Sequence, residues 1–228
     1  LCIYILQNRG RMLEKVEKPK TLKETTLEQL RLAIMIGQLE PGKRLVERTI
    51  CEQLGVSRTV VRECIRHLES EHLVTFSAGG SSVAVLESDE IRQIYHLRTM
   101  LESEAVRYCA EQVTPELVDK LQNHLVQIRE NLHAGDVVEA LAHSYSFYEH
   151  LFVTAGMTVA WELTERLNGR IGRLRFMTLS TQERATKGPN NLQDIVNSIA
   201  KGDSKSAIEA CRKHIDEACH MGLHLNKQ

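Results

Sequence analysis

The chain has 228 residues, of which 42% are hydrophobic, 26% charged and 4% aromatic. These values suit one large domain, or a small and a medium one, and are ordinary for a soluble globular protein. No apolar run approaches the roughly 18–20 residues that cross a bilayer, which excludes a membrane-spanning segment. The opening LCIYIL is too short for a signal-peptide core. We therefore expect a cytoplasmic protein that begins at Met12, with residues 1–11 as an upstream extension.

The charge is unevenly distributed along the chain. Residues 1–78 hold 13 Lys and Arg against 10 Asp and Glu, whereas residues 79–228 hold 16 against 20. This asymmetry indicates separate roles for the two parts. The six cysteines include no CxxC pair, which excludes a zinc ribbon and favours buried thiols in a reducing compartment.

The sequence between residues 21 and 69 predicts three short helices. The first ends at Gly37, and a Pro41-Gly42 turn follows it. The second ends at Gly55, and Ser57 is placed to cap the third. The apolar residues of the first two helices are Leu27, Leu30, Ile34, Ile36, Leu45, Ile50, Cys51 and Leu54.

Two short strands are predicted directly after these helices. Residues 73–76 are strand formers, residues 78–81 form a turn, and residues 83–85 form a return strand. Three helices followed by a hairpin are the arrangement of a winged helix-turn-helix. We place this domain at residues 21–87, behind an N-terminal extension at residues 1–20.

From residue 88 to residue 228 the sequence predicts only helices, packed as an antiparallel bundle. The first covers residues 89–112, and its inward stripe is Ile91, Ile94, Leu97, Leu101, Ala105 and Tyr108. Five more helices are predicted at residues 115–132, 137–153, 158–179, 192–200 and 205–223. The polar stretch at residues 180–191 is interpreted as a loop because it contains Gly and Pro. The predicted fold is therefore mainly α.

The third helix of the N-terminal domain, at residues 58–69, separates into two faces at about 100° per residue. The apolar face consists of Val60, Val61, Cys64, Ile65 and Leu68. The polar face consists of Arg58, Thr59, Arg62, Arg66 and Glu69. Because the apolar face must pack on a small core, the arginine face is forced outward.

An outward row of arginines is suited to DNA. The major groove admits an α-helix, and arginine grips guanine or phosphate through two parallel hydrogen bonds. Ser57, Arg58 and Thr59 lie at the N-terminal end, where free backbone N–H groups favour phosphate. The preceding helix, which carries Arg48, would cross the sugar-phosphate backbone. A solvated helix face is the plain alternative, but the neighbouring helix, turn and hairpin favour DNA.

The stretch LEPGKRLVERTICEQLGVSRTVVRECIRHLESEHLV resembles the DNA-binding domain of GntR-type bacterial transcription regulators, over about residues 27–85. The shared features are the Pro-Gly turn, an arginine in the second helix, and GVSRTxVRE. The resemblance implies that Arg48, Arg58, Thr59 and Arg62 contact DNA, with a wing tip at Gly79-Gly80 near the minor groove. The wing SAGGSS lacks the basic residue that the family often carries there.

The helical half resembles the FadR-like subgroup of the same family, through HLRTMLESEAVRYCAEQVTPELVDKL and AKGDSKSAIEACRKHI. In that subgroup a bundle of six or seven helices binds a small effector and dimerises. Many relatives also hold a metal with one Asp and three His. Those four positions map here to Ser144, Tyr148, Leu192 and His214.

Only His214 among the four mapped positions is a metal ligand of the family type. A divalent ion needs several nitrogen or oxygen ligands, so we predict no metal and no other cofactor. Three other histidines are candidate substitute ligands, and packing or surface roles are the favoured interpretation for all of them: His96, His143 and His150.

Without a metal, the bundle could bind an anionic metabolite. The candidate cations are Arg98, Arg173 and Arg175, and the candidate hydrogen-bond partners are Ser144, Tyr148 and His214. Arg98 lies where the family carries the arginine of LRxxLE. An ion pair with Glu102, four residues later, is its competing role.

These observations predict a dimeric, sequence-specific DNA-binding transcription regulator, most simply a repressor. Its two heads would insert their arginine helices into successive major grooves of a near-palindromic operator. An effector would shift the population of head arrangements, with residues 78–88 as the mechanical joint. One alternative is an effector-free architectural DNA-binding protein with a degenerate ligand domain. The other is an enzyme, for which the sequence offers no Ser/His/Asp order, phosphate loop or paired apolar carboxylates.

Overall fold

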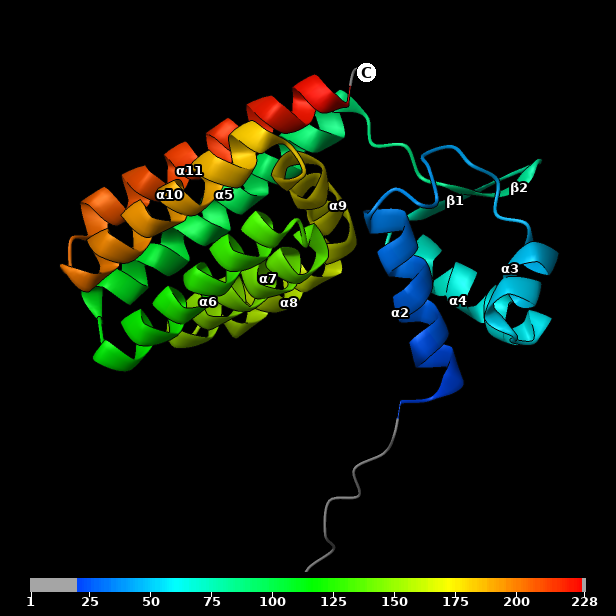
Figure 1. Ribbon diagram of the computed structural model, residues 1–228, viewed down its shortest axis with the longest axis horizontal. Coiled ribbons are helices and arrows are strands. Elements are labelled where there is room, and N and C mark those ends of the chain that lie inside the picture. Colours follow the sequence, from blue (N-terminus) through cyan, green and yellow to red (C-terminus); the bar gives the residue numbers. More distant parts are fainter. Residues whose placement is uncertain (1–19, 227–228) are drawn as a thin grey trace, which may run out of the picture.

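The computed structural model describes residues 20–226. In this part of the chain, three helices and a two-stranded hairpin form an N-terminal head, and seven helices form a bundle beside it (Figure 1). We use "head" for residues 21–83 and "bundle" for residues 88–225. The predicted fold class, a mainly helical chain with a winged head before a helical bundle, is confirmed. The extension predicted at residues 1–20 falls outside the described residues except for Lys20.

The helices of the head begin and end where their sequence signals predict. The side chain of Thr21 accepts from the backbone N–H of Glu24, whose own side chain accepts from Thr21 N, so α2 starts with a complete capping box. Gly55 ends α3 with a φ of 65°, a left-handed conformation that glycine adopts without steric cost. Ser57 accepts from Val60 N and caps α4. The three helices are α2 (Leu22–Met35), α3 (Glu47–Leu54) and α4 (Arg58–Ser70).

The hairpin pairs β1 (Val74–Ser77) with β2 (Gly80–Val83) in antiparallel register. Its turn is tighter than predicted, because Ser77 pairs directly with Gly80 and only Ala78 and Gly79 connect the strands. Gly80 has a φ of 104°, which a residue with a Cβ rarely adopts. Residues 80 and 81 therefore belong to the second strand rather than to the turn.

The head and the bundle have separate hydrophobic cores. The core of the head gathers the inward residues of α2, α3 and α4 with both strands; its members include Leu30, Ile34, Ile50, Ile65 and Leu68. The core of the bundle runs from Leu86 to Ala218. Each unit thus has its own apolar interior.

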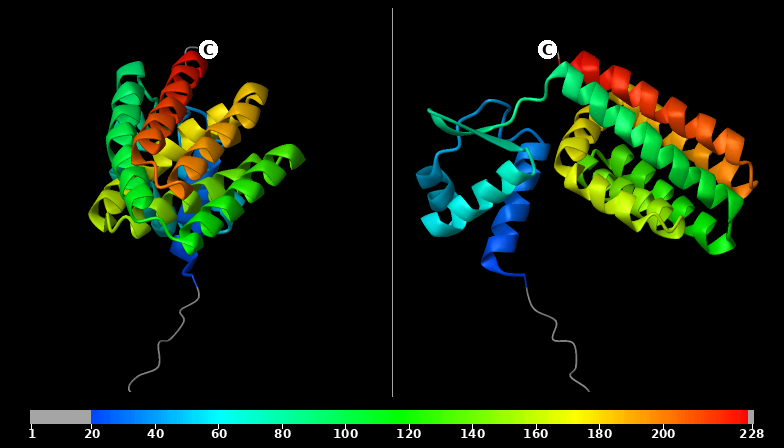
Figure 2. Two further views of the ribbon diagram at one scale, coloured as in Figure 1. Left: turned by 90° about the vertical axis from the view of Figure 1, so that its left-hand side faces the viewer. Right: turned by 180° about the vertical axis from the view of Figure 1, so that it is seen from behind.

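The bundle helices lie side by side, with the head set against one end (Figure 2). Their bounds are α5 (Ser88–Glu111), α6 (Pro115–Ala134), α7 (Val137–Thr154), α8 (Thr158–Arg166), α9 (Asn168–Leu179), α10 (Gln182–Ala200) and α11 (Ser204–Leu225). The longest shared faces join α5 to α11 and α6 to α7.

Two predicted elements of the bundle were wrong. The single helix expected at residues 158–179 is divided at Leu167 into α8 and α9. Of the loop expected at residues 180–191, residues 182–191 form the first half of α10. Thr181 caps that half by accepting from Arg184 N, and an ion pair of 2.8 Å joins Glu183 to Lys187 one turn later.

The inward face of α5 also differs from the apolar stripe that was predicted. Leu97 is 43% exposed, whereas Arg98 and Glu102 are almost fully buried. These two side chains can lie inside because they pair with each other at 2.7 Å. A buried ion pair is invisible to a search for apolar periodicity.

α9 forms the contact between the bundle and the head (Figure 1). A Cβ on Gly169 would lie 2.5 Å from Leu73 Cδ1, and one on Gly172 would lie 3.1 Å from Met35 Sδ. The two glycines therefore let α9 approach the head closely. The connecting segment, residues 84–87, is also held to the bundle, because Asn226 donates to the carbonyl of Leu86 at 2.8 Å.

Candidate nucleic-acid interface and buried arginine site

The two faces of α4 are as the sequence predicts. Val61, Cys64, Ile65 and Leu68 are at most 1% exposed, and Val60 packs against the same core. The residues of the opposite face are all exposed: Arg58, Thr59, Arg62, Arg66 and Glu69. The arginine face points away from the core of its own domain.

The arginines on the surface of the head differ in their partners. Within the described residues, Arg58 and Arg66 have no ion-pair partner. Arg62 reaches back to α3, where its Nε lies 3.0 and 2.9 Å from the two carboxylate oxygens of Glu47. Arg48 lies 3.7 Å from Glu52, one turn along α3. The surface thus carries unpaired guanidinium groups beside one that is held in place.

The N-terminal end of α4 offers backbone donors. The hydroxyl of Ser57 is engaged with Val60 N at 3.4 Å. The first amides of a helix, here those of Arg58 and Thr59, have no carbonyl partner within the helix. An anion placed at this end would meet both amides and the favourable helix dipole.

The wing tip gains a basic residue that the sequence analysis missed. Gly79 is exposed and Gly80 half-buried at the end of the hairpin. The guanidinium of Arg44 lies against Gly80, at 3.5 Å from where a Cβ would stand. Arg44 reaches the wing because it forms an antiparallel bridge to Ser82, as a third chain segment beside β2. The sequence shows basic residues at Lys43 and Arg44, before the second helix. It does not show that Arg44 pairs with the wing, because Ser82 is far away along the chain.

The interior of the bundle contains a small cavity of about 30 Å³. Its lining includes four of the six predicted effector residues, namely Arg98, Ser144, Arg175 and His214, together with Arg184, Thr178, Gly188, Pro189 and Leu192. The fifth, Tyr148, lies beside it with its ring 4.1 Å from the Arg175 guanidinium carbon. Its buried hydroxyl has no hydrogen-bond partner among residues 20–226. Burial raises the pKa of this phenol, which therefore stays protonated as a donor.

Arg173, the sixth predicted effector residue, does not line this cavity. It donates to the carbonyl of Ala84 at 3.3 Å, in the segment that connects the head to the bundle. Arg173 and Arg175 are two residues apart on α9, so they point in different directions around the helix. Arg175 faces the cavity and Arg173 faces the connection.

The cavity is dominated by guanidinium groups. Glu102 accepts from Arg98 at 2.7 and 3.3 Å, and the same carboxylate lies 3.4 Å from Arg175. Burial, the largest single influence, lowers the pKa of Arg98, but the charge and hydrogen bond of Glu102, together with Tyr148 and Tyr95, raise that pKa overall. For Arg175, burial and the nearby charge of Arg98 lower the pKa. The ion pair that competed with the effector role of Arg98 is therefore present.

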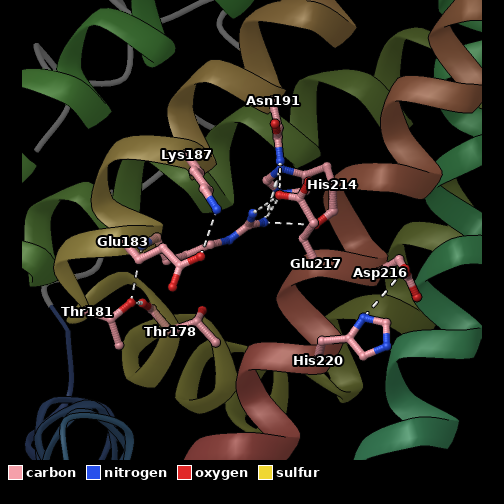
Figure 3. Close-up of polar contacts among 10 residues, drawn as sticks. Thr178, Thr181, Glu183, Lys187, Asn191, His214, Asp216, Glu217 and His220 are labelled. Carbon is pink, nitrogen blue, oxygen red and sulfur yellow. Dashed lines mark hydrogen bonds and ion pairs between the residues drawn. The ribbon is translucent and has the colours of Figure 1, made fainter.

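Arg184 is the cavity residue that the sequence analysis missed, because it lies in the stretch taken for a loop. It is 4% exposed and donates to the carbonyl of His214 at 2.8 Å. Its Nη2 is also 3.2 and 3.3 Å from the two ring nitrogens of His214. Burial, followed by the charge of Arg184, lowers the pKa of His214 well below its usual value, so this imidazole is neutral at neutral pH. Figure 3 shows the hydrogen bonds that converge around His214 and Glu217.

The residues of this cavity do not fit the metal site that the family resemblance implies. Three of the four mapped positions, Ser144, Leu192 and His214, do line one cavity, so the mapping is geometrically consistent. Their atoms, however, supply a hydroxyl, a methyl group and one imidazole, beside the positive charges of Arg98 and Arg175. Throughout residues 20–226, no group of three or more His, Cys, Asp or Glu side chains is arranged to hold a metal ion.

The substitute histidines lie elsewhere. His96 is exposed on α5. His143 and His150 share a face of α7, as their spacing predicts, and both rings pack near His124 of α6, with centroids 5.6 and 5.1 Å away. Burial first, and then the two neighbouring histidines, lower the pKa of His124.

Comparisons with known proteins agree with this geometry. Residues 22–84 match the gntR family of bacterial regulatory proteins, and residues 93–217 match the FCD domain. The chain belongs to the GntR family. It is a transcription regulator with an FCD domain, and not an enzyme.

Individual relatives span most of this GntR-family chain. YdhC, an HTH-type transcriptional regulator of Bacillus subtilis, is 25% identical over 92% of this chain and 95% of its own. The transcriptional repressor RspR of Escherichia coli is 24% identical over 82% and 83%. The solved structure of E. coli McbR/YncC superposes with a TM-score of 0.72, at 23% identity, over 92% of this chain and 99% of the other. No helix in the described part of this chain is long and apolar enough to cross a membrane.

Proposed function

We propose that this regulator reads its operator with the outward face of α4. The supporting observation is that this face is exposed while the opposite face packs on the core of the head. Arg58, Arg62 and Arg66 are placed along the groove-facing side, and the Ser57–Thr59 end meets phosphate. Arg48 lies at the DNA backbone, and Arg44 accompanies the wing tip at Gly79-Gly80.

Arg62 has a distinct place in this interface. Its Nε donates to both carboxylate oxygens of Glu47, and the side chain remains 60% exposed. An exposed ion pair contributes little to stability. Arg62 can therefore exchange Glu47 for a guanine or a phosphate at small cost, and Glu47 keeps it extended until DNA arrives.

Operator reading requires two heads in this proposal. A helix-turn-helix dimer binds two half-sites about one helical turn apart, and the symmetry of the site mirrors that of the protein. We assign the chain as a homodimer on these grounds, with a repressor role like the one that the name of RspR states. Its work on DNA takes place in the cytoplasm.

The second part of the proposal is that a small anionic metabolite binds inside the bundle without a metal. Its support is the convergence of Arg98, Arg175 and Arg184 with Ser144 and His214 around one cavity. An effector-free architectural role accounts poorly for this arrangement. Buried guanidinium groups cost free energy unless they are paired.

α9 is the element that joins this cavity to the head. Arg175 lines the cavity, while Gly169, Gly172 and Arg173 of the same helix contact the head and its connecting segment. A ligand that draws Arg175 towards itself would rotate or shift α9 against Leu73. Such a shift biases the population of head positions rather than breaking DNA contacts directly.

Selection of operators from random duplex DNA tests the proposal. We expect the purified chain to enrich a near-palindromic sequence with half-sites separated by about one helical turn, 10–10.5 base pairs. Light scattering of the protein on that sequence should give two chains per duplex. Enrichment of no sequence, or of a single unrepeated half-site bound by one chain, would contradict it.

A further inference from the structure

The hairpin of the head has no charge of its own. Every residue from Val74 to Val83 is apolar, a small hydroxyl residue or glycine. Lys and Arg supply most of the attraction between a protein and the phosphates of DNA, so these residues alone would add little to it. Any cation at the turn of this hairpin therefore comes from another part of the chain.

Residues 42–45 bring such a cation to the hairpin. They run beside β2 as a third chain segment, held by backbone hydrogen bonds of 2.9–3.0 Å, and Arg44 lies opposite Ser82 in this pairing. Side chains alternate across an extended segment, so Leu45 enters the core of the head while Arg44 stays outside. Backbone pairing thus fixes the place from which the Arg44 side chain leaves the chain.

The Arg44 side chain follows β2 towards the turn. Gly80 lies two residues nearer the turn than Ser82, which is about 6.6 Å at the rise of a strand. The guanidinium reaches this point, because its Nε and Nη2 both lie 3.5 Å from where a Cβ of Gly80 would stand. Since Gly80 has no side chain, the guanidinium can lie directly against the backbone of the hairpin.

The guanidinium of Arg44 has no competing partner. Among residues 20–226 it forms neither an ion pair nor a hydrogen bond, and the residue is exposed. Arg62, by contrast, is engaged with Glu47 on the same head. Arg44 can therefore bind a new group without breaking a contact within the described part of the protein.

The turn beside Arg44 is slim and accessible. Ala78, Gly79 and Gly80 offer no side chain larger than a methyl group. Figure 1 shows this turn at the end of the head farthest from the bundle, on the same side as α3. The bundle therefore does not cover it, and a duplex bound by the head could approach the turn closely.

We propose that Arg44 enters the minor groove beside each half-site and selects A·T base pairs there. The proposal rests on the operator reading proposed above and names the DNA that flanks each half-site. Major and minor grooves alternate along one face of a duplex, so an element beside a helix in the major groove meets the adjacent minor groove. Arg44 is the side chain that the hairpin presents to it.

The selection of A·T pairs follows from the shape of the minor groove. Runs of A·T pairs narrow this groove and make its potential more negative, which attracts a guanidinium. A G·C pair adds the N2 amino group of guanine, a donor, to the floor of the groove. A donor facing a donor is unfavourable, so both effects disfavour G·C pairs at the position of Arg44.

Base analogues in the selected operator test the assignment. The flanks outside the half-sites read by α4 are built from A·T, G·C or inosine·C pairs. Inosine is guanine without its N2 amino group, so inosine·C combines the minor-groove edge of A·T with the major-groove edge of G·C. By gel shift, the wild type should bind the A·T and inosine·C flanks alike, and the G·C flank about tenfold more weakly.

Three variants assign this preference to a side chain. Arg44→Ala should bind all three flanks alike, about as weakly as the wild type binds the G·C flank, with an unchanged unfolding temperature. Lys43→Ala removes the neighbouring exposed cation and is the matched control, which should keep the preference for A·T. Arg58→Ala should bind every flank more weakly and also keep the preference, because it acts in the other groove.

The outcomes separate this inference from the proposed function. Equal binding of all flanks by the wild type, an inosine·C flank that behaves like G·C, or an intact preference in Arg44→Ala would overturn the inference. An equal loss on all flanks in Arg44→Ala that Arg44→Lys restores would indicate a phosphate contact and overturn it as well.

Two further outcomes concern the proposed function. A flank preference carried by Arg44, together with full affinity in Arg58→Ala, Arg62→Ala and Arg66→Ala, would uphold the inference and contradict operator reading by α4. If selection from random duplexes enriches no operator, both are contradicted.

Discussion

The molecule has two arginine clusters in opposite physical settings. On α4, Arg58, Arg62 and Arg66 are exposed, and water solvates whatever charge is left unpaired. Inside the bundle, Arg98, Arg175 and Arg184 are at most 8% exposed and have two carboxylates among them. An arginine on α4 therefore keeps its charge in water at little cost in folding free energy, whereas an arginine inside the bundle lowers stability unless its charge is compensated.

This difference teaches where stability and binding are separable. An exposed arginine can be removed without harm to the fold, so its loss is felt only when DNA is present. A buried arginine or its partner takes part in both, because an uncompensated buried charge is expensive. Substitutions in the two clusters should accordingly give opposite patterns of stability and affinity.

The largest effect is expected from Glu102→Gln. This change removes the carboxylate shared by Arg98 and Arg175 and leaves two buried cations without it. Loss of one partner of a buried pair costs about 3–5 kcal/mol of unfolding free energy. Denaturant titration measures it, with Glu111→Gln, whose partner Arg107 is on the surface, as the matched control that should cost far less. Equal effects of the two changes would remove the contrast between buried and exposed clusters.

Gly169→Ala tests the contact that joins the cavity helix to the head. The added methyl would lie 2.5 Å from Leu73, which is buried, so we expect a loss of about 1–3 kcal/mol from overpacking, partly offset by the better helix propensity of alanine. Gly188→Ala is the control, because its methyl would find ordinary contacts at 3.6 Å and should stabilise the fold. If thermal unfolding moves in the same direction for both, α9 is not closely packed against the head.

A smaller effect is expected in the pH dependence of stability. Because the pKa of His214 is lowered in the folded protein, the unfolded chain binds the extra proton, and stability should fall as the pH drops below about 6.5. His214→Gln should flatten this slope, leaving the part that His124 contributes through its own lowered pKa. Unfolding free energies between pH 7.5 and 5 provide the measurement. The control is His96→Gln on the surface of α5, and a His214→Gln slope equal to that of this control would count against a buried neutral imidazole.

The sequence predicted the head almost completely, because its signals are local. Caps at Thr21 and Ser57, glycine at the end of α3 and the two faces of α4 each depend on residues within a few positions. The wing was the exception. Arg44 joins it through a bridge to a residue 38 positions later, which no local pattern encodes.

The bundle was less predictable because its interior is partly ionic. Arg98 and Glu102 interrupt the apolar stripe of α5, and residues 182–191 form a helix that looks like a loop in composition. Arg184 was missed for this reason, since its burial depends on α11 through His214 and Glu217. The sequence could not show that Arg173 lies outside the cavity, because its direction depends on how α9 is rotated against the head.

The most direct test of the account is the operator affinity of Arg58→Ala, measured by gel shift on the selected sequence. Arg58 is exposed and, within the described residues, unpaired, so its loss should cost about 1–3 kcal/mol per half-site and leave the unfolding free energy unchanged. Arg92→Ala, an exposed arginine on α5 paired with Asp89, is the matched control and should bind as the wild type does. Wild-type affinity in Arg58→Ala, repeated in Arg62→Ala and Arg66→Ala, would contradict the claim that the outward face of α4 reads DNA.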